Sequence, residues 1–122
     1  MYKRIDHLAL HVSDLDRSVD FYENHFGFRK YFQNEARPGF QIAYLKLGDT
    51  VLELTHRSDG TMKGFHFCIE TDDFDRAVSD LERQGVAVVQ PPHGTSPREA
   101  REAGWRRVVF QGPDGEQIEL RG

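Results

Sequence analysis

The stretch Gly64-Phe65-His66-Phe67-Cys68-Ile69-Glu70-Thr71-Asp72-Asp73-Phe74-Asp75-Arg76-Ala77-Val78 repeats a pattern found near the N-terminus. At a constant offset of 59 residues, His66 matches His7 and Asp73 matches Asp14. Several apolar and charged positions between and after them match as well. A repeat of this length indicates two copies of one half-domain. Each copy contains one strand, one helix and a histidine at the same position in its strand.

The bulk composition describes a globular protein of one domain. The chain has 122 residues, of which 38% are apolar and 30% are charged, and this is enough for one hydrophobic core. The net charge of -4 and the absence of a basic cluster argue against nucleic-acid binding. No apolar run is long enough to span a membrane. Cys68 is the only cysteine, so we expect no intrachain disulfide and a cytoplasmic location.

Hydrophobic spacing predicts the same order of elements in both halves: strand, helix and three further strands. Alternating or short apolar runs indicate the strands, which we place at 5–12, 28–32, 41–47, 50–55, 65–70, 86–89, 106–111 and 116–120. Two helical stripes begin after Ser13 and Asp72, which are candidate N-caps, and end at Gly27 and Gly85. The segments 33–40 and 91–105 read as loops, and a polar linker at 56–63 separates the halves.

Strand alternation places four potential metal ligands on the sheet faces opposite the helices. Leu52 and Leu54 would face a helix, so Glu53 between them faces away, and Glu119 lies between Ile118 and Leu120 in the same manner. His7 and His66 also lie opposite the large apolar residues of their strands. Two imidazoles and two carboxylates suit a borderline divalent ion such as Zn, Ni, Co, Mn or Fe.

A solvated sheet face is the simpler interpretation for any one of these residues, because an antiparallel sheet often leaves one face in water. The equivalent placement of both pairs in the two halves favours a metal site for the set. His11 shares the same face and could line a pocket, whereas His25, His56 and His93 read as surface residues. We interpret Cys68 as part of a pocket wall rather than as a nucleophile, since no neighbouring feature indicates activation.

Several motifs together resemble the vicinal oxygen chelate superfamily, which includes glyoxalases, bleomycin resistance proteins and ring-cleaving dioxygenases. The similarity extends over essentially the whole chain. Its motifs are Asp6-His7-Leu8-Ala9-Leu10, Ser13-Asp14-Leu15-Asp16-Arg17-Ser18, Phe26-Gly27-Phe28, Val51-Leu52-Glu53-Leu54, Gly64-Phe65-His66-Phe67 and Pro113-Asp114-Gly115-Glu116-Gln117-Ile118-Glu119-Leu120.

The resemblance implies an α+β fold in a single domain, residues 1–122. Two tandem βαβββ modules, approximately 4–56 and 64–121, would form curved, antiparallel-rich sheets with the helices on the outer face. It also implies an open metal site at His7, Glu53, His66 and Glu119, the positions that strand alternation selects. Family analogy and exposed sheet edges favour a homodimer.

The four retained ligands are most similar to those of glyoxalase I (lactoylglutathione lyase). We therefore expect a metal-dependent lyase or isomerase that polarises a substrate carbonyl and stabilises an enediolate. Glu119 by preference, and Glu53 otherwise, would carry the proton as base and then acid. This chain has His11 where short bacterial glyoxalases usually have a glutathione-binding arginine, so the thiol cofactor stays open.

Other members of the superfamily supply the alternatives. A methylmalonyl-CoA epimerase-like enzyme shares the fold and a similar site. A non-catalytic protein that binds or sequesters a small molecule, such as an antibiotic, would use the same trough without chemistry. Thiol transferases and ring-cleaving dioxygenases typically use two histidines and one glutamate, which would leave Glu53 surplus. Arg101, Arg106 and Arg107 are candidates to meet an anionic substrate, although solvated surface charge is the preferred interpretation of each. The 91–105 loop could act as a lid.

Overall fold

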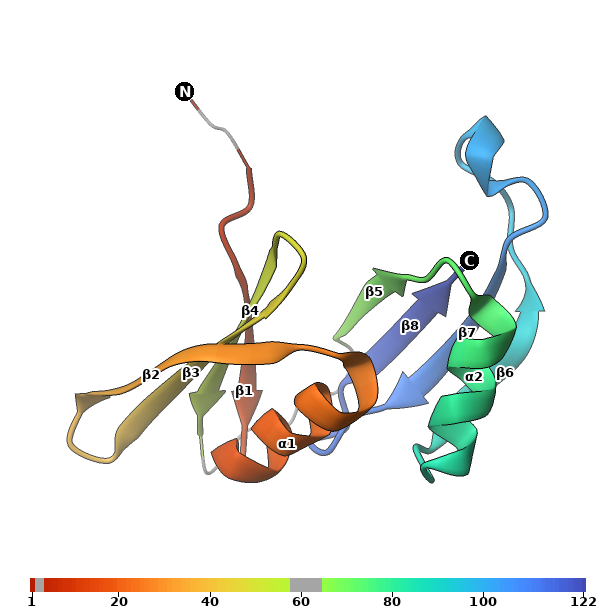
Figure 1. Ribbon diagram of the computed structural model, residues 1–122. Coiled ribbons are helices and arrows are strands. Elements are labelled where there is room, and N and C mark those ends of the chain that lie inside the picture. The colour runs from red at the N-terminus through yellow and green to blue at the C-terminus, as the bar shows by residue number, and fades with distance from the viewer. Residues whose placement is uncertain (2–3, 58–64) are drawn as a thin grey trace. The chain divides into compact units, whose positions relative to one another are not determined.

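The protein consists of two units that repeat one architecture. The computed structural model describes residues 1, 4–57 and 65–122, and the chain divides into the units Met1–Met62 and Lys63–Gly122. Among the described residues each unit has one α-helix and one four-stranded sheet, which can be followed in Figure 1. The βαβββ order predicted for each half is confirmed. Gly64 and most of the predicted linker lie outside the described residues.

The first unit contains the elements β1 (Leu8–Val12), α1 (Leu15–Phe26), β2 (Arg29–Arg37), β3 (Phe40–Leu47) and β4 (Thr50–His56). The strand order across the sheet is β1-β4-β3-β2. β1 pairs with β4 in parallel, and the two other pairings are antiparallel. The first and last strands of the unit therefore lie side by side.

The second unit repeats this topology with β5 (His66–Glu70), α2 (Phe74–Arg83), β6 (Val88–Gly94), β7 (Arg106–Gln111) and β8 (Gln117–Arg121). A short 3-10 helix, η1, covers Ala100–Glu102 between β6 and β7. The strand order is β5-β8-β7-β6, with β5 parallel to β8 and the other pairs antiparallel. Each strand of this sheet thus has a counterpart in the first.

The apolar stripes predicted from sequence form the two cores. In the first unit Leu15, Val19 and Tyr22 of α1 are buried, as are Leu52 and Leu54 of β4. In the second unit α2 buries Phe74, Val78 and Leu81, and the sheet buries Ile118 and Leu120 among others. Burial of alternate residues in β4 and β8 leaves Glu53 and Glu119 on the opposite face, as the alternation predicted.

Both helices begin one residue later than expected. The N-caps are Asp14 and Asp73, whose side chains accept hydrogen bonds from the backbone N–H groups three residues on. The predicted caps Ser13 and Asp72 were wrong: the Ser13 hydroxyl accepts a hydrogen bond from the Arg17 guanidinium instead. The caps match at the repeat offset, and a carboxylate at a helix N-terminus also interacts favourably with the helix dipole.

Two segments predicted as loops are partly strand. β2 continues to Arg37, through most of the segment 33–40, and β6 continues to Gly94, into the segment 91–105. Every residue of both strands is exposed, and both strands lie at the outer edge of their sheets. An edge strand of this kind carries no apolar alternation, and the edge position tolerates Pro91 and Pro92 because one side of the strand needs no hydrogen bonds. Within the described part of the chain, no helix has the length and apolar character needed to cross a membrane.

Candidate functional site

His7 and Glu53 form the first pair of the expected ligand set, and the structure brings them together. The His7 Nε2 atom lies 3.2 Å from Glu53 Oε2. His7 immediately precedes β1, and Glu53 lies in β4 opposite Ala9 in the parallel register. The His7 side chain is 37% exposed and that of Glu53 is 14% exposed. An imidazole nitrogen and a carboxylate oxygen at this separation can bind the same divalent ion.

A shell of polar contacts orients this pair. The Asp6 carboxylate lies 3.0 Å from His7 Nδ1, and the Thr55 hydroxyl donates to Glu53 Oε1 at 2.9 Å. The hydrogen bond with His7 lowers the pKa of Asp6, and the hydrogen bond to Glu53 raises the pKa of Tyr44. A carboxylate on the far imidazole nitrogen and donors on the carboxylate are what ligands of a metal ion usually have around them.

His66 and Glu119 occupy the corresponding positions in the second unit. Cys68 pairs with Glu119 in the β5–β8 register, just as Ala9 pairs with Glu53, and each histidine lies two residues before that position. The two half-sites are therefore equivalent within their sheets, although Glu119 is seven residues beyond the position that the offset of 59 predicts. His66 is exposed at the start of β5.

Glu119 has different neighbours from Glu53. Arg107 Nη2 lies 3.1 Å from Glu119 Oε2, and Arg121 Nε lies 4.0 Å from Glu119 Oε1. Only 12% of the Glu119 side chain is exposed. A metal ion bound by this carboxylate would compete with Arg107 for it.

No group of three His, Cys, Asp or Glu side chains that could hold a metal ion occurs among residues 1, 4–57 and 65–122. Within the first unit the structure brings His7 and Glu53 together. The set of four remains a prediction. Its chemistry fits a divalent ion, because each unit supplies one imidazole and one carboxylate on the sheet face that the helix leaves free.

Cys68 pairs with Glu119 in the β5–β8 register and is an exposed residue. Partial desolvation of its thiol, followed by the charge of Glu119, raises the pKa of Cys68 to about 11. A thiol that stays protonated is a poor nucleophile. This agrees with the expectation that Cys68 does not act as a nucleophile.

The three arginines considered from sequence have separate partners. Arg106 contacts Asp75 at 2.7 Å, and Arg101 contacts both Glu70 and Glu99. Arg107 alone of these three reaches a candidate site residue, Glu119. Arg101, Arg106 and Arg107 therefore all form ion pairs within the protein.

Two further residues near Glu119, Arg121 and Glu102, were not predicted from the sequence to be part of the site. Arg121 could have been found, because it lies two residues after Glu119 in the same strand and so shares its face. Glu102 is wholly buried within a segment that reads as a polar loop, and no sequence pattern indicates its burial.

The chain matches the family model described as the Glyoxalase/Bleomycin resistance protein/Dioxygenase superfamily over residues 4–120. The protein belongs to this superfamily. It is 34% identical to lactoylglutathione lyase of Neisseria meningitidis over 133 aligned positions, which cover 96% of this chain and 88% of the relative. It is 32% identical to human mitochondrial methylmalonyl-CoA epimerase, covering 68% of this chain and 54% of that protein.

A solved structure supports the same fold. The glyoxalase family protein from Enterococcus faecalis superimposes with a TM-score of 0.81 at 23% sequence identity. The alignment covers 99% of this chain and 98% of that one. The resemblance stated from the motifs and the predicted fold class are both confirmed.

Proposed function

We propose that this superfamily member is a divalent-metal-dependent lyase or isomerase of the glyoxalase type, acting on a small carbonyl compound. The observation that carries the proposal is the contact between His7 and Glu53, 3.2 Å apart, at register positions that recur as His66 and Glu119. Its relatedness to lactoylglutathione lyase over nearly its whole length supports the reaction class.

The four residues His7, Glu53, His66 and Glu119 would hold the ion. When bound, a divalent ion would supply Lewis-acid polarisation of the substrate carbonyl and neutralise charge that develops on the oxygens. Asp6 fixes the His7 imidazole through Nδ1, which leaves Nε2 as the free ligating atom. Thr55 fixes one oxygen of Glu53 and so leaves the other toward His7.

Glu119 is the residue that would carry the proton, removing it from one carbon and returning it to the neighbouring carbon. A general base has to be able to leave its partners and approach the substrate. Among the described residues Glu119 contacts Arg107 and Arg121, whereas Glu53 is held by Thr55 and Tyr44 and also contacts His7. We therefore assign the proton transfer to Glu119 and the role of structural ligand to Glu53.

The test is an activity assay on protein purified without a histidine tag, stripped of metal and reloaded with Ni or Zn. The substrate is the hemithioacetal of methylglyoxal and glutathione, with bacillithiol and other thiols in parallel. We expect the metal to restore isomerisation, and E119Q to lower kcat by about 100-fold or more while still binding the ion. Full turnover in metal-loaded E119Q would show that another residue is the base, and no turnover with any thiol would contradict the glyoxalase reaction.

An epimerase would use the same proton transfer, and the human relative makes it the second candidate. Exchange of the α-proton of methylmalonyl-CoA with deuterated solvent separates the two reactions. A protein that binds its ligand tightly but turns over neither substrate would instead act by sequestration.

Assembly and compartment are part of the same proposal. Exposed edge strands, β2 and β6, offer unpaired backbone groups for contact with a second copy. We therefore expect a homodimer, which light scattering after size exclusion will measure. The single cysteine agrees with a reducing compartment such as the cytoplasm.

A further inference from the structure

Arg107 and Arg121 lie on the same face of the second sheet as Glu119. We propose that these two arginines form a binding site for a carboxylate group of the substrate, which takes the place of Glu119 when that glutamate turns to the metal. This inference rests on the proposed function for the movement of Glu119. It also makes a claim about the arginines that can be tested without metal or turnover.

The two arginines need an anion between them. They are direct cross-strand partners in the β7–β8 register, and like charges at such positions repel. Glu119 offsets the repulsion, with one oxygen 3.1 Å from Arg107 and the other 4.0 Å from Arg121. When Glu119 leaves, Arg121 keeps its ion pair with Glu102 at 3.2 Å, but Arg107 loses the anion that it contacts. Another carboxylate is the group that fits between the two guanidinium groups.

Both guanidinium groups have a spare donor. The Nε atoms of Arg107 and Arg121 are buried and have no hydrogen-bond partner among the described residues. The Arg121 side chain is 9% exposed. A buried N–H without a partner is costly, and Glu119 at 4.0 Å is too far to satisfy the one on Arg121. A substrate carboxylate accepts up to about four hydrogen bonds, so it can satisfy donors that Glu119 does not.

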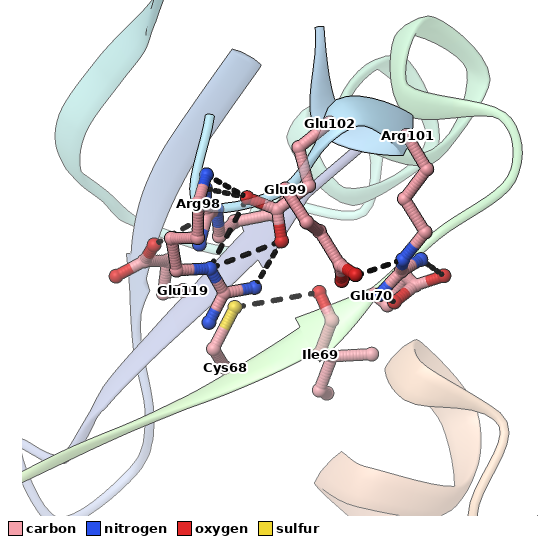
Figure 2. A network of polar contacts seen from close by, with 9 residues as sticks. Cys68, Ile69, Glu70, Arg98, Glu99, Arg101, Glu102 and Glu119 are labelled. Carbon is pink, nitrogen blue, oxygen red and sulfur yellow. Dashed lines mark hydrogen bonds and ion pairs between the residues drawn. The ribbon is translucent and has the colours of Figure 1, made fainter. Parts of the chain in front are cut away.

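Glu102 holds Arg121 in place. Its side chain is wholly buried and accepts from Arg121 Nη2 at 3.2 Å, while Arg98 donates to it from the backbone N–H at 2.8 Å and from Nε at 3.0 Å. The Arg98 hydrogen bonds hold the pKa of Glu102 at about 2. Figure 2 shows the paired Arg98 and Glu102 side chains near Glu119 and Cys68. A guanidinium fixed in advance loses little conformational freedom on binding an anion.

The first unit shows that the sheet itself does not require the arginines. Ile42 pairs with Thr55 at the register positions that correspond to Arg107 and Arg121. Thr55 there donates to the carboxylate of Glu53, which corresponds to Glu119. The same topology is thus built once with an apolar and a hydroxyl side chain and once with two cations. We therefore assign the two arginines a role in ligand binding at the second half-site rather than in forming the sheet.

The ligand class follows from the geometry of the donors. Paired guanidinium groups bind planar carboxylates through charge-assisted hydrogen bonds and discriminate against neutral amides or esters. The substrate, or the thiol that it is joined to, is expected to carry at least one free carboxylate.

The experiment measures succinate binding to the full-length, metal-free protein by calorimetry, with succinamide as the neutral probe. E119Q removes the competing charge from both arginines. We expect E119Q to bind succinate about ten-fold more tightly than the unmodified protein, and neither to bind succinamide. Adding R107Q to E119Q should abolish the gain.

Arg106→Gln in the E119Q background is the matched control. It removes the same charge from the neighbouring residue, but Arg106 contacts Asp75 and lies over the ring of Phe74, 4.6 Å from its centroid. The gain in succinate affinity should survive R106Q. Equal affinity of E119Q and the unmodified protein, or loss of the gain in R106Q as well as R107Q, overturns the proposal.

The outcome is independent of the reaction. If E119Q gains succinate affinity while metal-loaded protein shows no isomerisation, the carboxylate site stands and the glyoxalase function fails. If isomerisation is found but E119Q gains no succinate affinity, the glyoxalase function stands and the carboxylate site fails. Should E119Q not fold, succinate affinity is compared in the unmodified protein with and without Zn. The same measurement on R107Q distinguishes binding of succinate to the arginine from direct binding of succinate to the ion. Zn-loaded R107Q that binds succinate as tightly as Zn-loaded unmodified protein then overturns the site, and a loss of about ten-fold supports it.

Discussion

Individual side chains near the two half-sites differ in how far the sequence predicts them. Strand alternation places Glu53 and Glu119 on the correct face, because burial of their leucine and isoleucine neighbours leaves no other arrangement. The cross-strand partner of Glu119 depends on the register between β7 and β8, which no residue pattern gives, so the contact of Arg107 with Glu119 could not be predicted. Thr55 lies two residues after Glu53 in the same strand and shares its face, so that contact could have been predicted, as could the position of Arg121 beside Glu119.

Glu102 makes a prediction at the level of one residue. Its pKa is about 2 in the folded protein against an ordinary value of 4.5, so its contribution to stability is present above pH 4.5 and is lost as the pH falls toward 2. Glu102→Gln should destabilise the protein at pH 7, because a buried charge-assisted hydrogen-bond network loses its anion. Urea denaturation from pH 7 to pH 3 should then show a weaker acid dependence in E102Q than in the unmodified protein.

Glu99→Gln is the control for this measurement. Glu99 is 56% exposed at its side chain and contacts Arg101 at 2.8 Å, so it has the same type of partner without burial. E99Q should keep the acid dependence of the unmodified protein. An E102Q protein with the unmodified stability at pH 7 and the unmodified acid dependence would contradict the role given to Glu102.

Among the elements, the helices and the strands β3, β4, β5, β7 and β8 were predicted closely, and the outer strands β2 and β6 were not. β7 has the residues expected from sequence, and both helices lie where their apolar stripes indicate. β2 and β6 are longer than predicted, because a strand exposed on both faces forms by backbone pairing to one neighbour and needs no apolar alternation. Their irregular register with β3 and β7 agrees with this weak side-chain specification.

The β7–β8 hairpin gives the prediction for an element. Glu116 in its turn is fully buried and accepts from the backbone N–H of Asp114 at 2.9 Å. A Cβ on Gly112 would lie 2.7 Å from Glu116 Cγ and inside contact distance of the carboxyl group. Gly112→Ala should therefore lower the free energy of unfolding by about 1–3 kcal/mol, measured by chemical denaturation.

Gly94→Ala in β6 is the matched substitution. No atom lies within 4 Å of a Cβ built there, and the backbone is not in the left-handed region. G94A should change the unfolding free energy by less than about 1 kcal/mol. If G112A is as stable as G94A, the buried Glu116 carboxyl adapts to the extra atom and does not fix the turn.

At the scale of the whole molecule, internal repetition carries most of what the sequence predicts. The offset of 59 residues shows two modules with matching strands, helices and histidines, and the structure builds two sheets of the same strand order. In both modules a glutamate has the same register, with Glu53 opposite Ala9 and Glu119 opposite Cys68, and a histidine lies two residues before that partner. The repeat does not predict where the two modules differ. The clearest difference between the two half-sites is the presence of arginines around Glu119.

The central claim is that both modules contribute ligands to one metal ion, and metal binding measures it directly. Protein purified without a tag and stripped of metal is titrated with Zn against a chromophoric chelator. We expect one ion per chain, with affinity reduced by about 100-fold or more in each of H7A, E53A, H66A and E119A. H25A, which removes the imidazole that packs on Phe21 in α1, should keep the affinity. Binding that depends on His7 and Glu53 but is unchanged in H66A and E119A, or no binding at all, would contradict the claim.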